Sequence, residues 1–273
     1  MKTYSKVYLT VIFALLYAPI VVMMFFSFNE GQSLAVFSGF SLKWYKEFFK
    51  DSVAMNALWN TFLLAVLSSL ISTLIGTFAA LGIDRMRNKK LKNAVMMGTN
   101  LPMVNPDIVT GISLMLVFVF IGRIMLFDHA LNFWTLLIAH VTFNLPYVIM
   151  SVLPKFKQMD KHLVEAALDL GCTPTQAFYK VELPSITPGI MTGAIMAFTL
   201  SLDDFVISNF TSGVDFQTLP MYIYSMTKKT VKPDMYALST LIFIVIFILL
   251  VIINLPSKEE RAIKKKKGKR RSV

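Results

Sequence analysis

Three aspartates lie in stretches of the sequence that are otherwise apolar: Asp107, and the adjacent pair Asp203 and Asp204. A carboxylate within the hydrocarbon of a bilayer costs at least about 2.5 kcal/mol on insertion scales, so its presence indicates a cavity, a partner or a function. A water-filled route lined by carboxylates suits a flexible cationic amine, because carboxylates pair with ammonium groups and aromatic faces attract cations. We therefore predict that the three aspartates line a pathway for such a cation. In the alternative, Asp107 caps a half-helix after Pro106, and the pair lies near the outer face of the bilayer.

The sequence carries no pattern for covalent chemistry. It has no glycine and lysine phosphate loop, no dinucleotide fingerprint and no nucleophile elbow, so we expect no enzyme activity and no cofactor in this chain. His129, His140 and His162 lack metal-ligand spacing, and His140 is expected to be a hydrogen-bonded packing residue. The single cysteine, Cys172, excludes an internal disulfide and a cysteine-based metal cluster. Energy for any transport must therefore come from a partner.

The elements that position these residues are expected to be membrane helices. Of 273 residues, 55% are hydrophobic and only 16% are charged, and the mean hydropathy is +0.62. A soluble domain would carry about 25% charged residues, so the composition indicates a membrane protein. The net charge is +11, but residues 258–273 hold nine Lys or Arg against two Glu. Such a run after an apolar segment is typical of a tail held at anionic lipid headgroups, and we expect no binding of nucleic acid.

Six apolar stretches are long enough to cross a hydrocarbon core of roughly 30 Å as helices, which takes about 20 residues. The first stretch is too long for the apolar core of a signal peptide and lacks a cleavage pattern, so it is expected to be a retained helix. We predict an all-α membrane protein with spans at Val7–Phe28, Leu58–Ile83, Ala94–Ile121, Phe133–Leu153, Pro188–Ile207 and Tyr236–Leu255.

The distribution of basic residues predicts the orientation of these spans. Of the Lys and Arg residues outside the spans, 20 fall in the two termini and in loops 84–93 and 154–187, and 7 fall in the other segments. Because cytoplasmic loops carry the excess of positive charge, both termini are expected in the cytoplasm. We predict a transmembrane domain at 1–257 and a basic cytoplasmic tail at 258–273. The outer segments contain Trp44, Tyr45, Tyr222 and Tyr224, which are interpreted as interfacial aromatics or as a docking surface for an external partner.

The cytoplasmic loop 154–187 is predicted to form two short helices that meet at a tight corner. Asp160 can cap the first helix, and Gly171 stands where a left-handed C-terminal cap is wanted. The sequence Thr173-Pro174-Thr175-Gln176 then reads as a capping box that opens a second helix, expected to end at Leu183-Pro184. This hairpin either presents an apolar surface to a cytoplasmic partner or folds back and packs on its own bundle.

The same loop carries a motif of known families. Glu165-Ala166-Ala167, Gly171 and Val181-Glu182-Leu183-Pro184 resemble the EAA loop of the inner-membrane permeases of binding-protein-dependent ABC importers, with valine in place of the usual isoleucine. The resemblance implies a type I importer fold of six helices and a coupling helix that enters a cleft on an ATPase subunit. It assigns ATPase coupling to Glu165, Ala166, Ala167, Gly171, Leu183 and Pro184.

Further motifs are similar to those of spermidine/putrescine importer permeases. They are Lys43-Trp44-Tyr45, Pro106-Asp107-Ile108-Val109, Ser201-Leu202-Asp203-Asp204 and Leu219-Pro220. The resemblance implies ATP-driven uptake of polyamines across a bacterial inner membrane, and it adds Ser201 and Trp44 to the predicted substrate pathway.

The implied partners are a homologous second permease, two ATPase subunits that hold ATP and Mg²⁺, an external polyamine-binding protein and membrane lipid. One alternative is an ATP-driven importer of the same kind for another substrate, such as a different amine, iron, thiamine or an anion. Acidic residues in the spans argue against an anion. Another alternative is an ion-coupled carrier or channel that works without ATP, and a third is a membrane enzyme.

Overall fold

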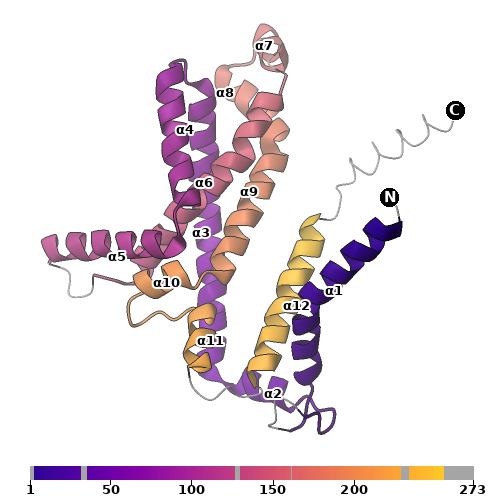
Figure 1. Cartoon of the computed structure of the whole chain (residues 1–273). Coiled ribbons are helices and arrows are strands. Elements are labelled where there is room, and N and C mark those ends of the chain that lie inside the picture. The colour runs from indigo at the N-terminus through magenta and orange to yellow at the C-terminus, as the bar shows by residue number, and fades with distance from the viewer. Residues whose placement is uncertain (1–2, 32–35, 127–129, 161, 229–233, 255–273) are drawn as a thin grey trace. The chain divides into compact units, whose positions relative to one another are not determined.

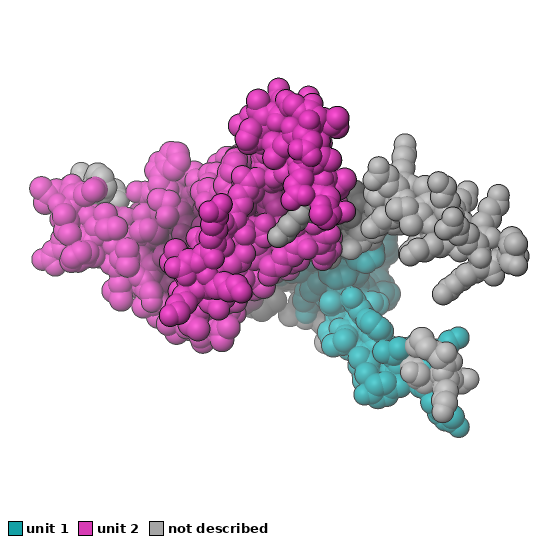
Figure 2. Space-filling model, turned by 90° about the horizontal axis from the view of Figure 1, so that it is seen from above, with its two compact units in different colours: residues 1–51, 230–273 teal, residues 52–229 magenta. Residues whose placement is uncertain are grey.

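A computed structural model describes residues 3–31, 36–126, 130–160, 162–228 and 234–254, which include no part of the predicted tail 258–273. Helices make up 83% of these residues, and five of the helices are long and apolar enough to cross a membrane. A shorter apolar helix, Met235–Ile244, lies at the sixth predicted position. The chain divides into two compact units, residues 1–51 with 230–273 and residues 52–229, coloured separately in Figure 2.

Three long helices form the core of unit 52–229: α3 (Ser52–Arg85), α6 (Phe133–Gln158) and α9 (Leu183–Asp203), which run side by side in Figure 1. Residues with small side chains let them approach closely. Gly189, Gly193, Ala197 and Ser201 are all buried on α9, as their four-residue spacing predicts. A Cβ atom added at Gly189 would lie 2.8 Å from the carbonyl oxygen of Ser151 on α6, so only glycine allows this contact.

The third predicted span, Ala94–Ile121, is not one helix. The chain forms α4 (Lys89–Val104) and α5 (Asp107–Ile124), and Figure 1 shows α5 leaving α4 at a steep angle. Proline has no N–H to donate and drives the preceding residue out of the helical region. Asn105 and Pro106 are accordingly extended, with ψ of 137° and 135°. Pro106 therefore separates the two helices, whereas Pro102 lies within α4.

The fifth predicted span, Pro188–Ile207, also ends earlier than expected. Helix α9 stops at Asp203 because Asp204 is extended (φ −67°, ψ 122°), and Ile207 belongs to the short helix α10 (Val206–Thr211). Helix α11 (Leu219–Thr227) follows and packs against α3, where the Thr61 hydroxyl accepts a hydrogen bond of 2.7 Å from the Leu219 backbone N–H.

The loop between α6 and α9 contains the two predicted short helices, α7 (His162–Asp169) and α8 (Pro174–Ala177). The prediction that the second one ends at Leu183-Pro184 was wrong. Helix α8 continues through a π-helical segment, Phe178–Glu182, into α9 without a break, giving 30 helical residues from Pro174 to Asp203. The wider π turn shifts the bonding, so the Leu183 N–H bonds to the Phe178 carbonyl, and it accommodates Pro184 just inside the next helix.

Unit 1–51 with 230–273 contains α1 (Thr3–Phe26), α2 (Lys43–Lys50) and α12 (Asp234–Asn254). Helix α2 is amphipathic and buries Trp44 and Phe48 on its apolar face. The indole N–H of Trp44 donates a 2.7 Å hydrogen bond to the carbonyl oxygen of Asn29, which fixes the turn after α1.

Candidate functional site

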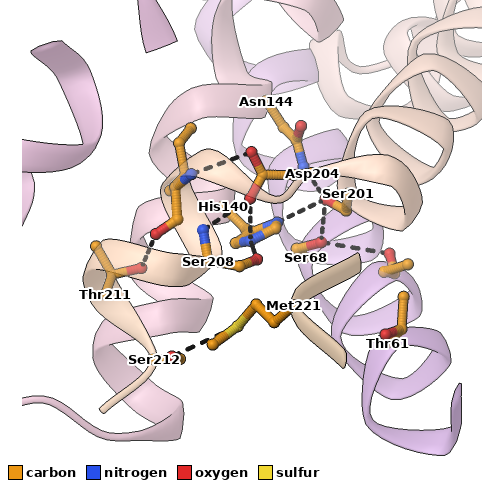
Figure 3. A network of polar contacts seen from close by, with 12 residues as sticks. Thr61, Ser68, His140, Asn144, Ser201, Asp204, Ser208, Thr211, Ser212 and Met221 are labelled. Atoms are coloured by element: carbon orange, nitrogen blue, oxygen red, sulfur yellow. Dashed lines mark hydrogen bonds and ion pairs between the residues drawn. The ribbon is translucent and has the colours of Figure 1, made fainter. Parts of the chain in front are cut away.

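A buried polar cluster joins four helices of unit 52–229 at the point where α9 ends (Figure 3). His140 lies at its centre: the imidazole Nδ1 is 3.1 Å from Ser201 Oγ on α9, and Nε2 is 3.0 Å from Ser208 Oγ on α10. Ser68 of α3 lies 2.9 Å from Ser201, and the Asn144 amide donates to the same hydroxyl at 2.8 Å. His140 is thus a hydrogen-bonded packing residue, as predicted.

Asp204 closes this cluster from the break between α9 and α10. Its carboxylate oxygens accept hydrogen bonds from the backbone N–H groups of Ile207 (3.2 Å) and Ser208 (2.7 Å), and Oδ2 lies 3.5 Å from His140 Nε2. The side chain of Asp204 is only 8% exposed. A neutral imidazole that carries its proton on Nε2 can donate toward Asp204 or Ser208 and accept from Ser201 at Nδ1, so both ring nitrogens have partners. In this structure Asp204 therefore caps α10 and fixes the ring of His140.

The other two aspartates have exposed side chains. Asp203 is the last residue of α9, and Asp107 is the first residue of α5, just after Pro106. Helix α5 packs on α10, since a Cβ at Gly111 would lie 3.6 Å from the Ile207 Cα. Figure 1 shows the two helix breaks that carry the aspartates near one another, about midway along α3. The structure separates the three predicted residues into one buried cap and two exposed carboxylates.

An aromatic pair includes the residue that directly follows the two adjacent aspartates. Phe205 directly follows Asp204, and its ring centroid is 4.4 Å from that of Tyr224 on α11. The ammonium of Lys228 lies 4.6 Å from the centroid of the Tyr224 ring. Tyr224 is 44% exposed. The ring of Tyr224 is therefore placed where a primary ammonium group can lie against it.

The remaining predicted pathway residues, Ser201 and Trp44, are both buried. Ser201 is fully occupied by the hydrogen bonds of the His140 cluster. Trp44 belongs to unit 1–51 with 230–273 and packs within it.

The loop between α6 and α9 has the local geometry that its sequence predicts. Asp160 accepts a bond from the His162 backbone N–H, and the box of Thr173 and Gln176 is formed on both sides. Gly171 has φ of +87°, and the Cys172 N–H bonds to the Ala167 carbonyl, the pattern of a glycine-terminated helix.

Exposed and buried side chains of the loop fall into two groups. Ala167 and Ala177 are buried, where α7 packs on α8 and the π segment. Glu165 is exposed and lies 3.0 Å from His162 Nδ1. Large apolar side chains are also left in the open, with Leu170 at 85% and Tyr179 at 63% exposure. Ala166, Gly171 and Pro184 are exposed and Leu183 is partly buried.

Sequence reasoning missed an ion pair at the base of this loop. The Arg85 guanidinium, at the end of α3, donates to both carboxylate oxygens of Glu182, at 2.8 and 3.0 Å. The two residues are 97 positions apart. Glu182 lies within the EAA-like motif, but nothing in a single sequence links it to Arg85. In the part of the chain that the structure describes, no three His, Cys, Asp or Glu side chains gather as metal ligands.

This arrangement, with its bundle of long apolar helices and its helical loop between two of them, is that of an importer permease of the inner membrane. The family model of the binding-protein-dependent transport system inner membrane component matches residues 72–256, more than half of the chain, and the protein belongs to this family. It is a multi-pass membrane protein and a transport subunit.

Curated relatives are similar over most of their length. The chain is 36% identical over 230 residues to the putrescine transport system permease protein PotI of Escherichia coli K12, covering 84% of this chain and 82% of the relative. It is 34% identical over 252 residues to the spermidine/putrescine transport system permease protein PotC of Haemophilus influenzae, covering 92% and 95%.

Solved structures show the same fold at lower identity. A chain of a bacterial ABC transporter that imports the acidic polysaccharide alginate superposes with a TM-score of 0.70, at 17% identity, covering 92% of this chain and 93% of that one. A chain of a bacterial alginate ABC transporter in complex with an alginate-bound periplasmic protein gives a TM-score of 0.68, at 17% identity. The fold of this chain is thus that of an ABC importer permease.

Proposed function

We propose that this chain is a permease subunit of an ATP-driven importer of polyamines, the class that includes spermidine and putrescine. The observation that carries this proposal is the identity of 33–36% to polyamine permeases over most of the chain. The fold alone does not select the cargo, because a permease of the same fold serves an acidic polysaccharide.

The exposed groups at the end of α9 suit such a cargo. Asp203 supplies a carboxylate, and Tyr224 offers a ring face that already lies against the ammonium of Lys228. A polyamine is a flexible chain with an ammonium at each end, so a carboxylate and an aromatic face can each hold one end. Asp107, at the neighbouring helix break, adds a second exposed carboxylate. We assign these residues to the substrate pathway and give Asp204 and Ser201 the role of holding the α9 end in place.

The loop around Glu165 to Pro184 is the proposed coupling element. The exposed side chains of Leu170 and Tyr179, with Glu165, form a surface that a cleft on a cytoplasmic ATPase subunit can take up. ATP and Mg²⁺ act on two such subunits, a homologous permease completes the pathway, and an external binding protein delivers the cargo. ATP binding closes the ATPases and moves the loop, and α9 transmits this movement to Asp203.

The test is uptake of radiolabelled spermidine and putrescine into proteoliposomes that hold this chain with its partner permease, ATPases and binding protein. We expect uptake to require ATP inside. Asp203→Asn and Tyr224→Leu should each raise the KM for uptake, while Glu165→Ala should lower uptake and leave the basal ATPase rate. ATPase stimulation without uptake of either amine would reject the cargo, and uptake without ATP would reject the importer.

A further inference from the structure

The ion pair between Arg85 and Glu182 joins two elements at the base of the coupling loop. Arg85 is the last residue of α3, and Glu182 is the last residue of the π-helical segment. One guanidinium nitrogen lies 2.8 Å from Oε1 and 3.0 Å from Oε2 of the carboxylate, so both oxygens are held by the same donor. The pair is charge-assisted on both sides, which makes it one of the stronger polar contacts of the fold.

Burial of the two partners is unequal. The Glu182 side chain is 7% exposed and that of Arg85 is 57% exposed. A carboxylate that has lost most of its water needs a partner, whereas an exposed guanidinium remains hydrated without one. Arg85 therefore determines where Glu182 can lie, and the carboxylate cannot leave Arg85 without a cost.

The ion pair lies at the π segment, where it can stiffen the connection between the loop and the bundle. The π segment stands between α8 of the loop and α9 of the bundle, and π turns interrupt the regular bonding of a helix. A push on the loop could be absorbed at this irregular turn. The contact with Arg85 holds that turn against α3, the helix on which α9 packs.

We propose that Arg85 and Glu182 form a positioning pair that transmits movement of the coupling loop to α3 as well as to α9. The inference rests on the proposed role of the loop. With the pair intact, displacement of the loop moves both helices together. Without it, the π turn yields, and ATP is hydrolysed with less transport.

The first test is the ratio of substrate imported to ATP hydrolysed, in the full reconstituted complex. Arg85→Gln should lower this ratio about fivefold or more, the lower limit of typical coupling between two sites. Glu182→Gln should lower it too, and because this change leaves no buried charge, it should assemble as the wild type does. The exchange Arg85→Glu with Glu182→Arg should restore part of the ratio. Arg87→Gln is the matched control, since Arg87 is exposed two residues further on, and it should leave the ratio unchanged.

A second test does not depend on the cargo. The native Cys172 in the loop and a cysteine introduced at Gly82 of α3, where an added Cβ meets no atom within 4 Å, can carry spin labels. In the full complex with cysteine-free partners, the distance between them should be narrowly distributed and shift on addition of ATP. In Arg85→Gln the distribution should broaden.

Two results would overturn the proposal. In the first, variants of the pair show the same ratio of substrate imported to ATP hydrolysed, and the same spin-label distances, as Arg87→Gln. In the second, transport falls only in proportion to the amount of complex that assembles. Failure of the cargo assignment looks different. In that case the wild type hydrolyses ATP without polyamine uptake, and the spin-label distances still test the pair.

Discussion

The imidazole Nε2 of His140, on α6, lies 3.5 Å from the carboxylate oxygen Oδ2 of Asp204, the residue at which α9 ends. Both side chains are buried, and the ring also contacts Ser201 and Ser208. One histidine thus fixes the position of the α9 end, and with it the position of the exposed neighbour Asp203. His140, to which we assign no part in binding, can in this way set the geometry of Asp203, a residue of the proposed substrate pathway.

Replacement of His140 should destabilise the end of α9. His140→Ala removes the ring and leaves Asp204 and Ser201 without their shared partner, so we expect a loss of about 2 to 4 kcal/mol in stability. Thermal unfolding of the purified permease measures this as a lower Tm. Thr142→Ala, an exposed site on the same helix, serves as the control and should change little. An equal Tm for the two variants would contradict the central role of His140.

Close contact between α6 and α9 makes Gly189 sensitive to the smallest side chain. A Cβ there would lie 2.7 Å from Lys155 Cγ and 2.8 Å from a backbone oxygen, so Gly189→Ala must push the helices apart and should cost about 1 to 3 kcal/mol. Gly98→Ala is the matched control, because its Cβ meets nothing within 4 Å. That change should leave the Tm unchanged or raise it. The comparison is made by thermal unfolding, and a Tm ranked in the opposite order would argue against the close packing.

The adjacent aspartates at the end of α9 should respond differently to the same substitution. Asp204→Ala removes two capping bonds to α10 and should lower stability by about 1 to 2 kcal/mol. Asp203→Ala should leave the Tm in place and raise the KM for polyamine uptake. Measurement of Tm and uptake kinetics for both variants separates the two roles. If Asp203→Ala lowers the Tm and spares the KM, it is Asp203 that is structural.

Gly171 should be required for the corner of the coupling loop. Its φ of +87° is a left-handed conformation that costs an L-residue about 1 to 2 kcal/mol. We expect Gly171→Ala to lower the ATPase rate stimulated by the loaded binding protein, and Gly171→Asn to lower it less, since asparagine tolerates this conformation better. A Cβ at Gly171 would meet no other residue within 4 Å, so a clash with the surrounding structure is excluded as the cause. Equal rates for glycine, asparagine and alanine would show that the loop does not need this cap.

Composition and local patterns predicted much of this protein. Hydropathy predicted where the apolar helices lie, although it joined α4 and α5 into one span and carried the fifth span past Asp203. The small residues of α9 predicted which of its faces is buried. Cap signals such as Asp160, Gly171 and the Thr173 box were confirmed one by one, because each depends only on a few neighbouring residues.

What the sequence could not predict depends on residues far apart in the chain. The break at Asp204 depends on the backbone N–H donors of α10 and on His140, 64 positions earlier, so a run of apolar residues gave no sign of it. Arg85 and Glu182 meet only because α3 and α9 pack together. Pro184 was expected to end a helix, and the π turn before it cannot be recognised from residue types alone.

The continuous helix from Pro174 to Asp203 also constrains the length of this segment. Each residue added to or removed from a helix rotates everything beyond it by about 100° and shifts it by about 1.5 Å. The π segment Phe178–Glu182 holds one residue more than a regular turn needs, and so sets the direction in which the coupling loop faces relative to Asp203. Deletion of one residue there, other than Tyr179 or Glu182, would turn the loop away from the proposed ATPase partner without removing a proposed contact residue. Relatives that keep this coupling are therefore expected to differ from this chain between Pro174 and Asp203 by substitutions, and not by insertions or deletions.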